Sequence, residues 1–170
     1  MDKINLKGHP VQLIDDVTEV GVIAEDVTFV GKDLNEISLY DIDAEVKVLI
    51  SVPSLDTGVC QAETRRFNTE ISKRNGVTGL VISKDLPFAS KRFCETEGIE
   101  NIMTLSDFRY GDFGKEFGTE MVDGALKGLL ARVVFVVDKD NKVVHTEISG
   151  DILEEPNYEP VLAKIDALLA

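Results

Sequence analysis

The stretch VKVLISVPSLDTGVCQAETRRFN, residues 46–68, joins the pattern of a buried strand to the pattern of a helix, with a cysteine at the junction. Residues 46–52 are mostly apolar and rich in β-branched side chains, as expected for a strand, and a helix is predicted over about residues 58–74. Thr57 is a favoured N-cap residue, which puts Cys60 in the first helical turn. The N–H groups of a first turn are unpaired and carry partial positive charge, so they favour a thiolate over a neutral thiol. The stretch therefore predicts an activated thiol at the end of a strand.

A second interpretation of Cys60 stays open on the residues alone, because unpaired cysteines are among the most buried side chains and pack like small hydrophobic residues. The flanking residues Asp56 and Gly58 are typical of a turn rather than of an apolar helix stripe, which favours the reactive thiol. Asp56 also argues the other way, since a carboxylate beside the sulfur opposes a thiolate unless it points away or pairs with a cation. Pro53 restricts the backbone on the approach to this turn.

The pattern continues beyond this stretch as an alternation of strands and helices. Further strands are predicted at residues 79–83 and 102–105, with a second helix over about residues 86–96 between them. Such alternation is typical of a parallel sheet with helices on its faces. Residues 129–148 are predicted to form an antiparallel hairpin around the polar turn at residues 138–142.

The two ends of the chain complete the predicted fold. Residues 157–169 have the apolar spacing of an amphipathic helix, and residues 10–40 contain short strands near 11–14 and 27–30. The order of elements matches the thioredoxin-like arrangement, an α/β fold with a central mixed sheet flanked by helices, here with an N-terminal β-hairpin extension. Because no repeat or linker interrupts the pattern, we expect a single domain over residues 1–170.

Composition restricts the partners and the compartment. The chain has 18 Lys and Arg against 31 Asp and Glu, a net charge of −13, which repels phosphate backbones and anionic lipids and argues against nucleic acid or membrane partners. The opening MDKINLKGHP lacks the apolar core of a signal peptide, and no later apolar run has membrane-spanning length, so a cytoplasmic protein is expected. Two cysteines 34 positions apart do not form a disulfide scaffold.

The sequence gives no indication of a metal or an organic cofactor. His9 and His145 are the only histidines and lie far apart, so no ligand set with metal-site spacing is expected. There is no Gly-rich phosphate-binding loop. Residues 111–118 contain three glycines around two phenylalanines and are predicted to mark helix boundaries: Gly111, Phe113, Gly114, Phe117 and Gly118.

Three motifs carry a resemblance to a known family. Pro53-x-x-x-Thr57-x-x-Cys60 resembles the peroxidatic motif of the peroxiredoxins. A closer resemblance, to the bacterial thiol peroxidases or atypical two-cysteine peroxiredoxins, is carried by three stretches together: VPSLDTGVC at residues 52–60, DLPFASKRFC at 85–94 and LKGLLARVVFVVD at 126–138. The resemblance extends from Gly8 to the final helix, and it implies a thiol-dependent peroxidase that reduces hydrogen peroxide and organic hydroperoxides.

The resemblance implies roles for four residues around the peroxide. Cys60 is implied to be the peroxidatic thiolate, Thr57 a hydroxyl that bonds substrate and sulfur, Pro53 a shield over the pocket, and Arg132 a cation that holds the thiolate and polarises the peroxide. Without the family, Arg132 would be interpreted as a solvated charge at the end of a strand. Other arginines that could partner the thiolate are Arg65, Arg66 and Arg92.

The resemblance makes Cys94 the resolving cysteine of the same chain, whereas alone it would be interpreted as a core residue beside Phe88 and Phe93. It implies that a Cys60 sulfenic acid condenses with Cys94 to an intramolecular disulfide, which a thioredoxin-type reductant recycles. Two helices on one side of a sheet rarely bring two thiols into bonding range, so local opening around Cys94 is expected. The resemblance also implies a homodimer built across the face near the active site.

Two other function classes remain open. A thiol-disulfide oxidoreductase would share the fold, but it is expected to carry Cys-x-x-Cys at the helix start, and position 63 is Glu. A non-catalytic thioredoxin-like interaction module could retain two inert cysteines. Loss of both free thiols on treatment with peroxide would distinguish the peroxidase from this module.

Overall fold

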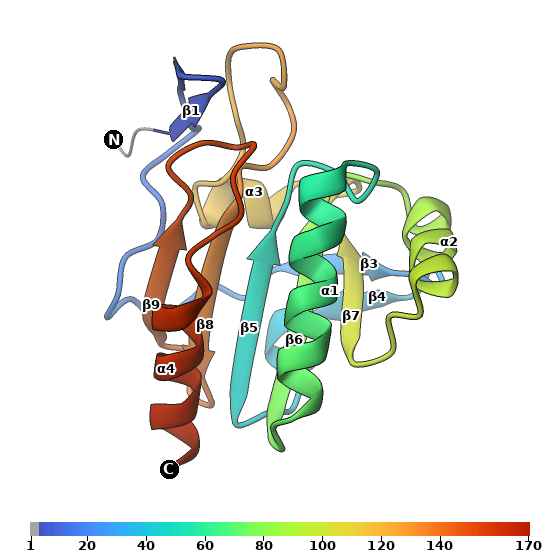
Figure 1. Cartoon of the computed structure of the whole chain (residues 1–170), viewed down its shortest axis with the longest axis vertical. Helices are drawn as coiled ribbons and strands as arrows, with labels where there is room; N and C mark the ends of the chain where they lie inside the picture. The colour runs from blue at the N-terminus through green and yellow to red at the C-terminus, as the bar shows by residue number, and fades with distance from the viewer. Residues whose placement is uncertain (1–3) are drawn as a thin grey trace.

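The computed structural model describes residues 4–170 and has a seven-stranded mixed sheet with helices on both faces (Figure 1). The strand order across the sheet is β4-β3-β7-β6-β5-β8-β9. The seven strands are β3 (Thr28–Gly31), β4 (Glu36–Ser38), β5 (Val46–Ser51), β6 (Val77–Ser83), β7 (Ile102–Ser106), β8 (Val133–Asp138) and β9 (Val143–Ile148). A separate hairpin of β1 (Ile4–Leu6) and β2 (His9–Val11) precedes them, so the predicted N-terminal β-hairpin is confirmed.

The helices form two layers around this sheet. They are α1 (Gly58–Ser72), α2 (Pro87–Glu97), α3 (Asp112–Glu116) and α4 (Tyr158–Leu169), with a short 3-10 helix η1 (Leu39–Asp41) before β5. In Figure 1, α1 and α4 lie in front of the sheet and α3 lies behind it. Buried side chains of α1, α2 and α4 join one apolar cluster, which also contains both cysteines. The two thiols therefore share one face of the sheet.

The central strand β5 explains why the sheet is mixed. It pairs in parallel with β6 and antiparallel with β8, and all six of its residues are buried. A strand covered on both faces has a continuous apolar run rather than an alternating one, which is the pattern that the sequence shows. Lys47 is the charged exception, and its buried amine donates to the carbonyl of Leu39 at 2.8 Å and to Asn141 Oδ1 at 2.9 Å.

Most predicted elements are confirmed, with shifts at their ends. The strand predicted from residue 79 begins at Val77, because β6 pairs with β5 from Val77 to Ile82. The predicted hairpin strand 129–138 begins only at Val133, since Leu130 forms an isolated bridge to Glu120 instead. The strand predicted at 11–14 is wrong in its limits, because β2 ends at Val11.

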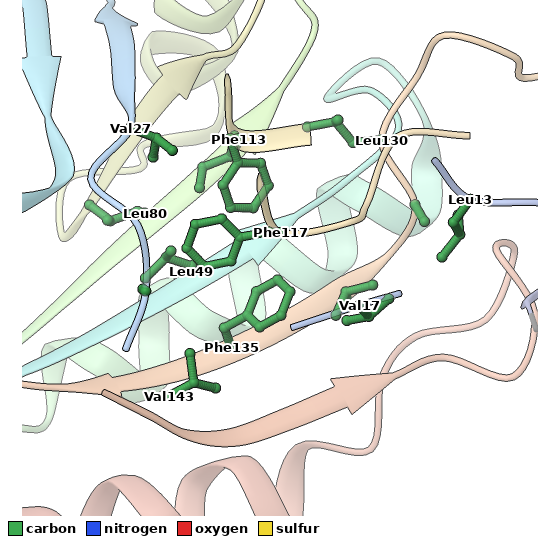
Figure 2. Close-up of a cluster of buried hydrophobic side chains, with 14 of the residues drawn as sticks. Leu13, Val17, Val27, Leu49, Leu80, Phe113, Phe117, Leu130, Phe135 and Val143 are labelled. Carbon is green, nitrogen blue, oxygen red and sulfur yellow. The ribbon is translucent and has the colours of Figure 1, made fainter. Parts of the chain in front are cut away.

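The face opposite α1 carries an aromatic core (Figure 2). The rings of Phe113 and Phe117 stack with centroids 4.7 Å apart, and Phe117 meets Phe135 edge-on at 5.1 Å. Gly118 has a φ of +73°, and a Cβ there would collide with the backbone of Asp16, so this glycine allows the N-terminal segment to close over the core. Within residues 4–170, no helix has the length and apolarity needed to cross a membrane.

Candidate active site

Cys60 lies in the first turn of α1, directly beyond the carboxyl end of β5. Thr57 is the N-cap, with extended backbone angles, and its Oγ1 accepts the N–H of Cys60 at 3.4 Å. The predicted cap and helix start are therefore confirmed. Cys60 is fully buried within the apolar cluster of α1, and its helix start directs unpaired N–H groups to the same region.

The loop between β5 and α1 is fixed by its own hydrogen bonds. The hydroxyl of Thr57 donates to the carbonyl of Ser54 at 3.3 Å, so in this arrangement it bonds the loop backbone. Pro53 is buried in the same loop. Asp56 is exposed, as expected if its carboxylate points away from the sulfur.

Arg132 reaches this site through the register of the sheet. The last antiparallel pair of β5 and β8 is Ser51 with Val133, so the residue before β8 lies beside the start of α1. The guanidinium is 1% exposed, which shows that the interpretation as a solvated strand-end charge is wrong. Its Nε donates to the carbonyl of Ile152 at 2.7 Å, and its Nη1 donates to Glu63 Oε2 at 2.7 Å.

The cysteine and the arginine interact electrostatically. Burial alone would lower the pKa of Arg132, but the negative charges of Cys60 and then Glu63 outweigh it and hold the pKa above its ordinary value. The guanidinium therefore stays charged and faces two groups that can be anionic.

Glu63 is the site residue that sequence reasoning missed. Glu63 stands where a Cys-x-x-Cys motif would have its second cysteine, three residues after Cys60, and it is fully buried. Burial raises the pKa of Glu63 to about 7, against the opposing effect of Arg132. Within residues 4–170, Glu63 Oε1 has no hydrogen-bond partner. An acidic residue one turn beyond the cysteine, on the buried helix face, was the available signal.

The other arginines proposed as thiolate partners lie elsewhere. Arg65 pairs with Glu97 at 3.1 Å, and Arg66 pairs with Glu70 and lies over the ring of Tyr158. These two arginines and Arg92 are exposed. Of the four candidates, the buried one is Arg132.

Cys94 lies in α2 and packs against the sheet. It is 7% exposed, and its thiol donates to Thr104 Oγ1 on β7 at 3.6 Å. Its neighbour Phe93 is buried, whereas Phe88 is 68% exposed. Both cysteines are free thiols, which makes this the dithiol arrangement.

A pocket of about 300 Å³ lies between the loop before α1 and the helix α2. Its lining comes from both segments that carry a cysteine and includes Ser54, Leu55, Asp56, Asp85, Arg92 and Phe93. A cavity of this size can hold a small organic molecule beside the first turn of α1.

The structure offers no metal cluster within residues 4–170, where no three His, Cys, Asp or Glu side chains gather in a suitable arrangement. His9 is exposed on β2. His145 on β9 lies 3.0 Å from Glu147.

Comparison with known proteins agrees with this geometry. The redoxin family model matches residues 19–162. A thiol peroxidase of Leptospira interrogans is 49% identical over 171 residues, covering 99% of this chain and the whole of that protein. One from Aquifex aeolicus is 46% identical over 166 residues, which is 98% of both chains.

Solved structures extend the comparison to the fold. The crystal structure of a peroxiredoxin-like protein from Aquifex aeolicus, 46% identical, superposes with a TM-score of 0.93 over 99% of this chain and 98% of that one. A thiol peroxidase from Chromobacterium violaceum, at 19% identity and a TM-score of 0.89, shows the same fold over 99% of this chain and 98% of that one. The predicted thioredoxin-like fold is confirmed, and the chain belongs to the thiol peroxidases, peroxiredoxin enzymes of the redoxin family.

Proposed function

We propose that the chain reduces hydrogen peroxide and organic hydroperoxides through a Cys60 sulfenic acid and a Cys60–Cys94 disulfide, which a thioredoxin-type protein reduces. The observation that carries this proposal is the buried Arg132 guanidinium, which interacts with Cys60 at the start of α1. A fixed cation in a water-poor site stabilises the thiolate and the negative charge that develops on the peroxide oxygens.

In the first step, the Cys60 thiolate attacks the terminal oxygen of the peroxide. The S–O bond forms as the O–O bond breaks, the cysteine is oxidised to the sulfenic acid, and the leaving oxygen takes a proton to become water or an alcohol. The Arg132 guanidinium stabilises the negative charge on the sulfur and the peroxide oxygens during this transfer. Thr57 would assist by turning its hydroxyl from Ser54 towards the substrate, while Pro53 limits water access.

In the second step, the thiol of Cys94 attacks the sulfenic sulfur of Cys60 and releases water, giving the disulfide. The Cys94 thiol faces Thr104 on β7 in the dithiol arrangement, so part of α2 must leave the sheet before the sulfurs meet. Each round of catalysis therefore includes a local opening of α2. Thiol–disulfide exchange with the reductant then restores both thiols.

The surface near this site supports a homodimer. Large apolar side chains are exposed where β6 and β7 end, on the side from which α2 begins: Leu86, Phe88, Phe108 and Tyr110. Exposed apolar groups of this kind are typical of protein contacts. A cytoplasmic location fits the free thiols and the need for a thioredoxin-type reductant. Sedimentation of the reduced protein tests the dimer.

Coupled turnover tests the function. The protein is mixed with thioredoxin, thioredoxin reductase and NADPH, and NADPH oxidation is followed after addition of hydrogen peroxide or cumene hydroperoxide. Consumption that depends on both peroxide and thioredoxin is expected. Absence of consumption with both peroxides would refute the proposed cycle.

A further inference from the structure

One carboxylate joins the loop that precedes Cys60 to the segment that leads into the Cys94 helix. Asp85 lies between β6 and α2, two residues before the first residue of α2. Its Oδ1 accepts the hydroxyl of Ser54 at 2.9 Å, and its Oδ2 accepts the N–H of Leu55 at 2.7 Å and the hydroxyl of Ser83 at 2.8 Å. Ser54 and Leu55 belong to the loop between β5 and α1.

The backbone of Asp85 is itself anchored to the sheet. Its carbonyl accepts the hydroxyl of Ser106 on β7 at 2.5 Å, and its N–H donates to the hydroxyl of Ser83 on β6 at 3.2 Å. The carboxylate therefore has a fixed position from which it holds the loop.

The hydrogen bonds from Asp85 continue to Cys60. Ser54 bonds Asp85 through its hydroxyl and accepts the hydroxyl of Thr57 at its carbonyl, and Thr57 in turn accepts the N–H of Cys60. The side chain of Asp85 thus links the loop that caps the Cys60 helix to the N-terminal end of α2. That side chain also lines the pocket between the two segments.

We propose that Asp85 is a positioning residue that holds the loop before Cys60 and the N-terminal end of α2 in the arrangement that reacts with peroxide. Its hydrogen bonds to this loop break when the disulfide forms. The inference rests on the proposed two-cysteine cycle. Bonds made only in the closed arrangement stabilise it against the open one, so their loss increases the open population. The peroxide step needs the closed loop, whereas the disulfide step needs the open helix.

The two half-reactions are therefore expected to respond to Asp85→Ala in opposite directions. Three hydrogen bonds to a charged group are lost, so the disulfide step is expected to become about tenfold faster or more, as the open population rises. The peroxide step is expected to become about tenfold slower, because the cap of the Cys60 helix loses its support. A side chain with a purely structural role would not accelerate one step of the cycle.

Both rates are measured on the full-length reduced protein. One equivalent of hydrogen peroxide is added, samples are quenched with an alkylating reagent at a series of times, and mass spectrometry separates thiol, sulfenic acid and disulfide. Circular dichroism checks the fold of every variant.

Two further variants make the comparison specific. In Asp85→Asn the amide oxygen can accept from Leu55 and Ser83 while the amide nitrogen donates to the oxygen of Ser54, so both rates are expected to stay within about threefold of the wild type. Asp26→Ala is the matched control, because Asp26 also accepts a serine hydroxyl and a backbone N–H, from Ser38 and Tyr40, and none of these three residues lines the pocket between the two cysteine segments. It is expected to leave both rates unchanged.

Opposite changes in the two steps for Asp85→Ala, with near-normal rates for Asp85→Asn and Asp26→Ala, support the inference. Unchanged rates, or a slower peroxide step without a faster disulfide step, overturn it. If Asp85→Ala does not fold, Ser54→Ala decides by the same criterion with a smaller change of about threefold, because it removes only one of the loop's bonds to Asp85. If the wild type itself forms no disulfide, the proposed cycle fails instead.

Discussion

Arg132 and Glu63 form a buried ion pair one helical turn from Cys60, with Nη1 of the arginine 2.7 Å from Oε2 of the glutamate. Both side chains are almost completely excluded from solvent. A buried charge is costly unless an opposite charge balances it. The charge states of Arg132, Glu63 and Cys60 therefore depend on one another. When Cys60 is a thiolate, its charge and that of Arg132 cancel if Glu63 carries a proton, which the raised pKa of Glu63 allows near neutral pH.

Replacement of Arg132 by Met is expected to slow the peroxide step by about a hundredfold to a thousandfold, because it removes the charge that stabilises the reacting sulfur and oxygens. Single-turnover kinetics with limiting peroxide measure the rate. An unchanged rate in the folded variant would mean that another arginine fills this role.

The same replacement leaves Glu63 buried without its partner, so it is also expected to destabilise the fold by about 3 kcal/mol or more. The double variant Arg132→Met, Glu63→Gln separates the two effects. It should recover much of the free energy of unfolding, because no unpaired charge is left, but none of the rate. Recovery of the rate as well would contradict a catalytic role for Arg132.

Glu63→Gln is expected to change how stability depends on pH. Burial raises the pKa of Glu63 from 4.5 to about 7, so the folded protein binds this proton more tightly than the unfolded chain. The resulting stabilisation is complete below pH 4.5 and is lost as the pH rises through 7. The free energy of unfolding of the wild type, measured with urea, should therefore fall relative to Glu63→Gln over this range, by about 3 kcal/mol at most. Parallel pH profiles for the two proteins would contradict the assignment.

Thr57→Val is expected to affect both the helix and the chemistry. The side chain loses its bond to the N–H of Cys60, which costs about 1 kcal/mol of stability, and it loses the hydroxyl proposed to bond the peroxide. Thr57→Ser keeps the hydroxyl and should retain most of both. Urea unfolding and single-turnover kinetics test the pair of variants, and equal peroxide rates for Val and Ser would limit Thr57 to a capping role.

Cys94→Ser is expected to reduce one equivalent of peroxide in a burst and then to stop turning over with thioredoxin. Without the second thiol, the sulfenic acid on Cys60 persists, and excess peroxide oxidises it to the sulfinic acid, which thioredoxin does not reduce. Quantification of residual peroxide gives the burst. Normal turnover of this variant with thioredoxin would make Cys94 a packing residue.

The local features of this site could be predicted from the sequence, whereas its long-range contacts could not. The cap at Thr57 and the first turn containing Cys60 depend on neighbouring residues, and both are confirmed. The burial of Arg132 depends on the register of β8 against β5, which no local pattern encodes. The place of Glu63 one turn after Cys60 was a local signal that was missed, whereas its pairing with Arg132, 69 positions away along the chain, is a long-range contact.

In the fold, too, local patterns could be predicted from the sequence, whereas features that depend on long-range packing could not. Helices with a long apolar pattern were predicted close to their observed limits, and α4 differs by one residue at its start. The five-residue helix α3 is too short to give a helical period, and its position depends on the packing of Phe113 and Phe117 against Phe135. Strand β4 was not predicted, because three residues carry too little alternation.

The central claim is that Cys60 reacts with peroxide and that Cys94 of the same chain resolves the product. Mass spectrometry of the reduced protein after one equivalent of hydrogen peroxide tests it most directly, with Cys60→Ser as the control that should consume no peroxide. The account predicts the loss of two hydrogens from the monomer mass and a single linked peptide that joins Cys60 to Cys94. Two free thiols after treatment, or a covalent dimer in place of the intramolecular disulfide, would contradict it.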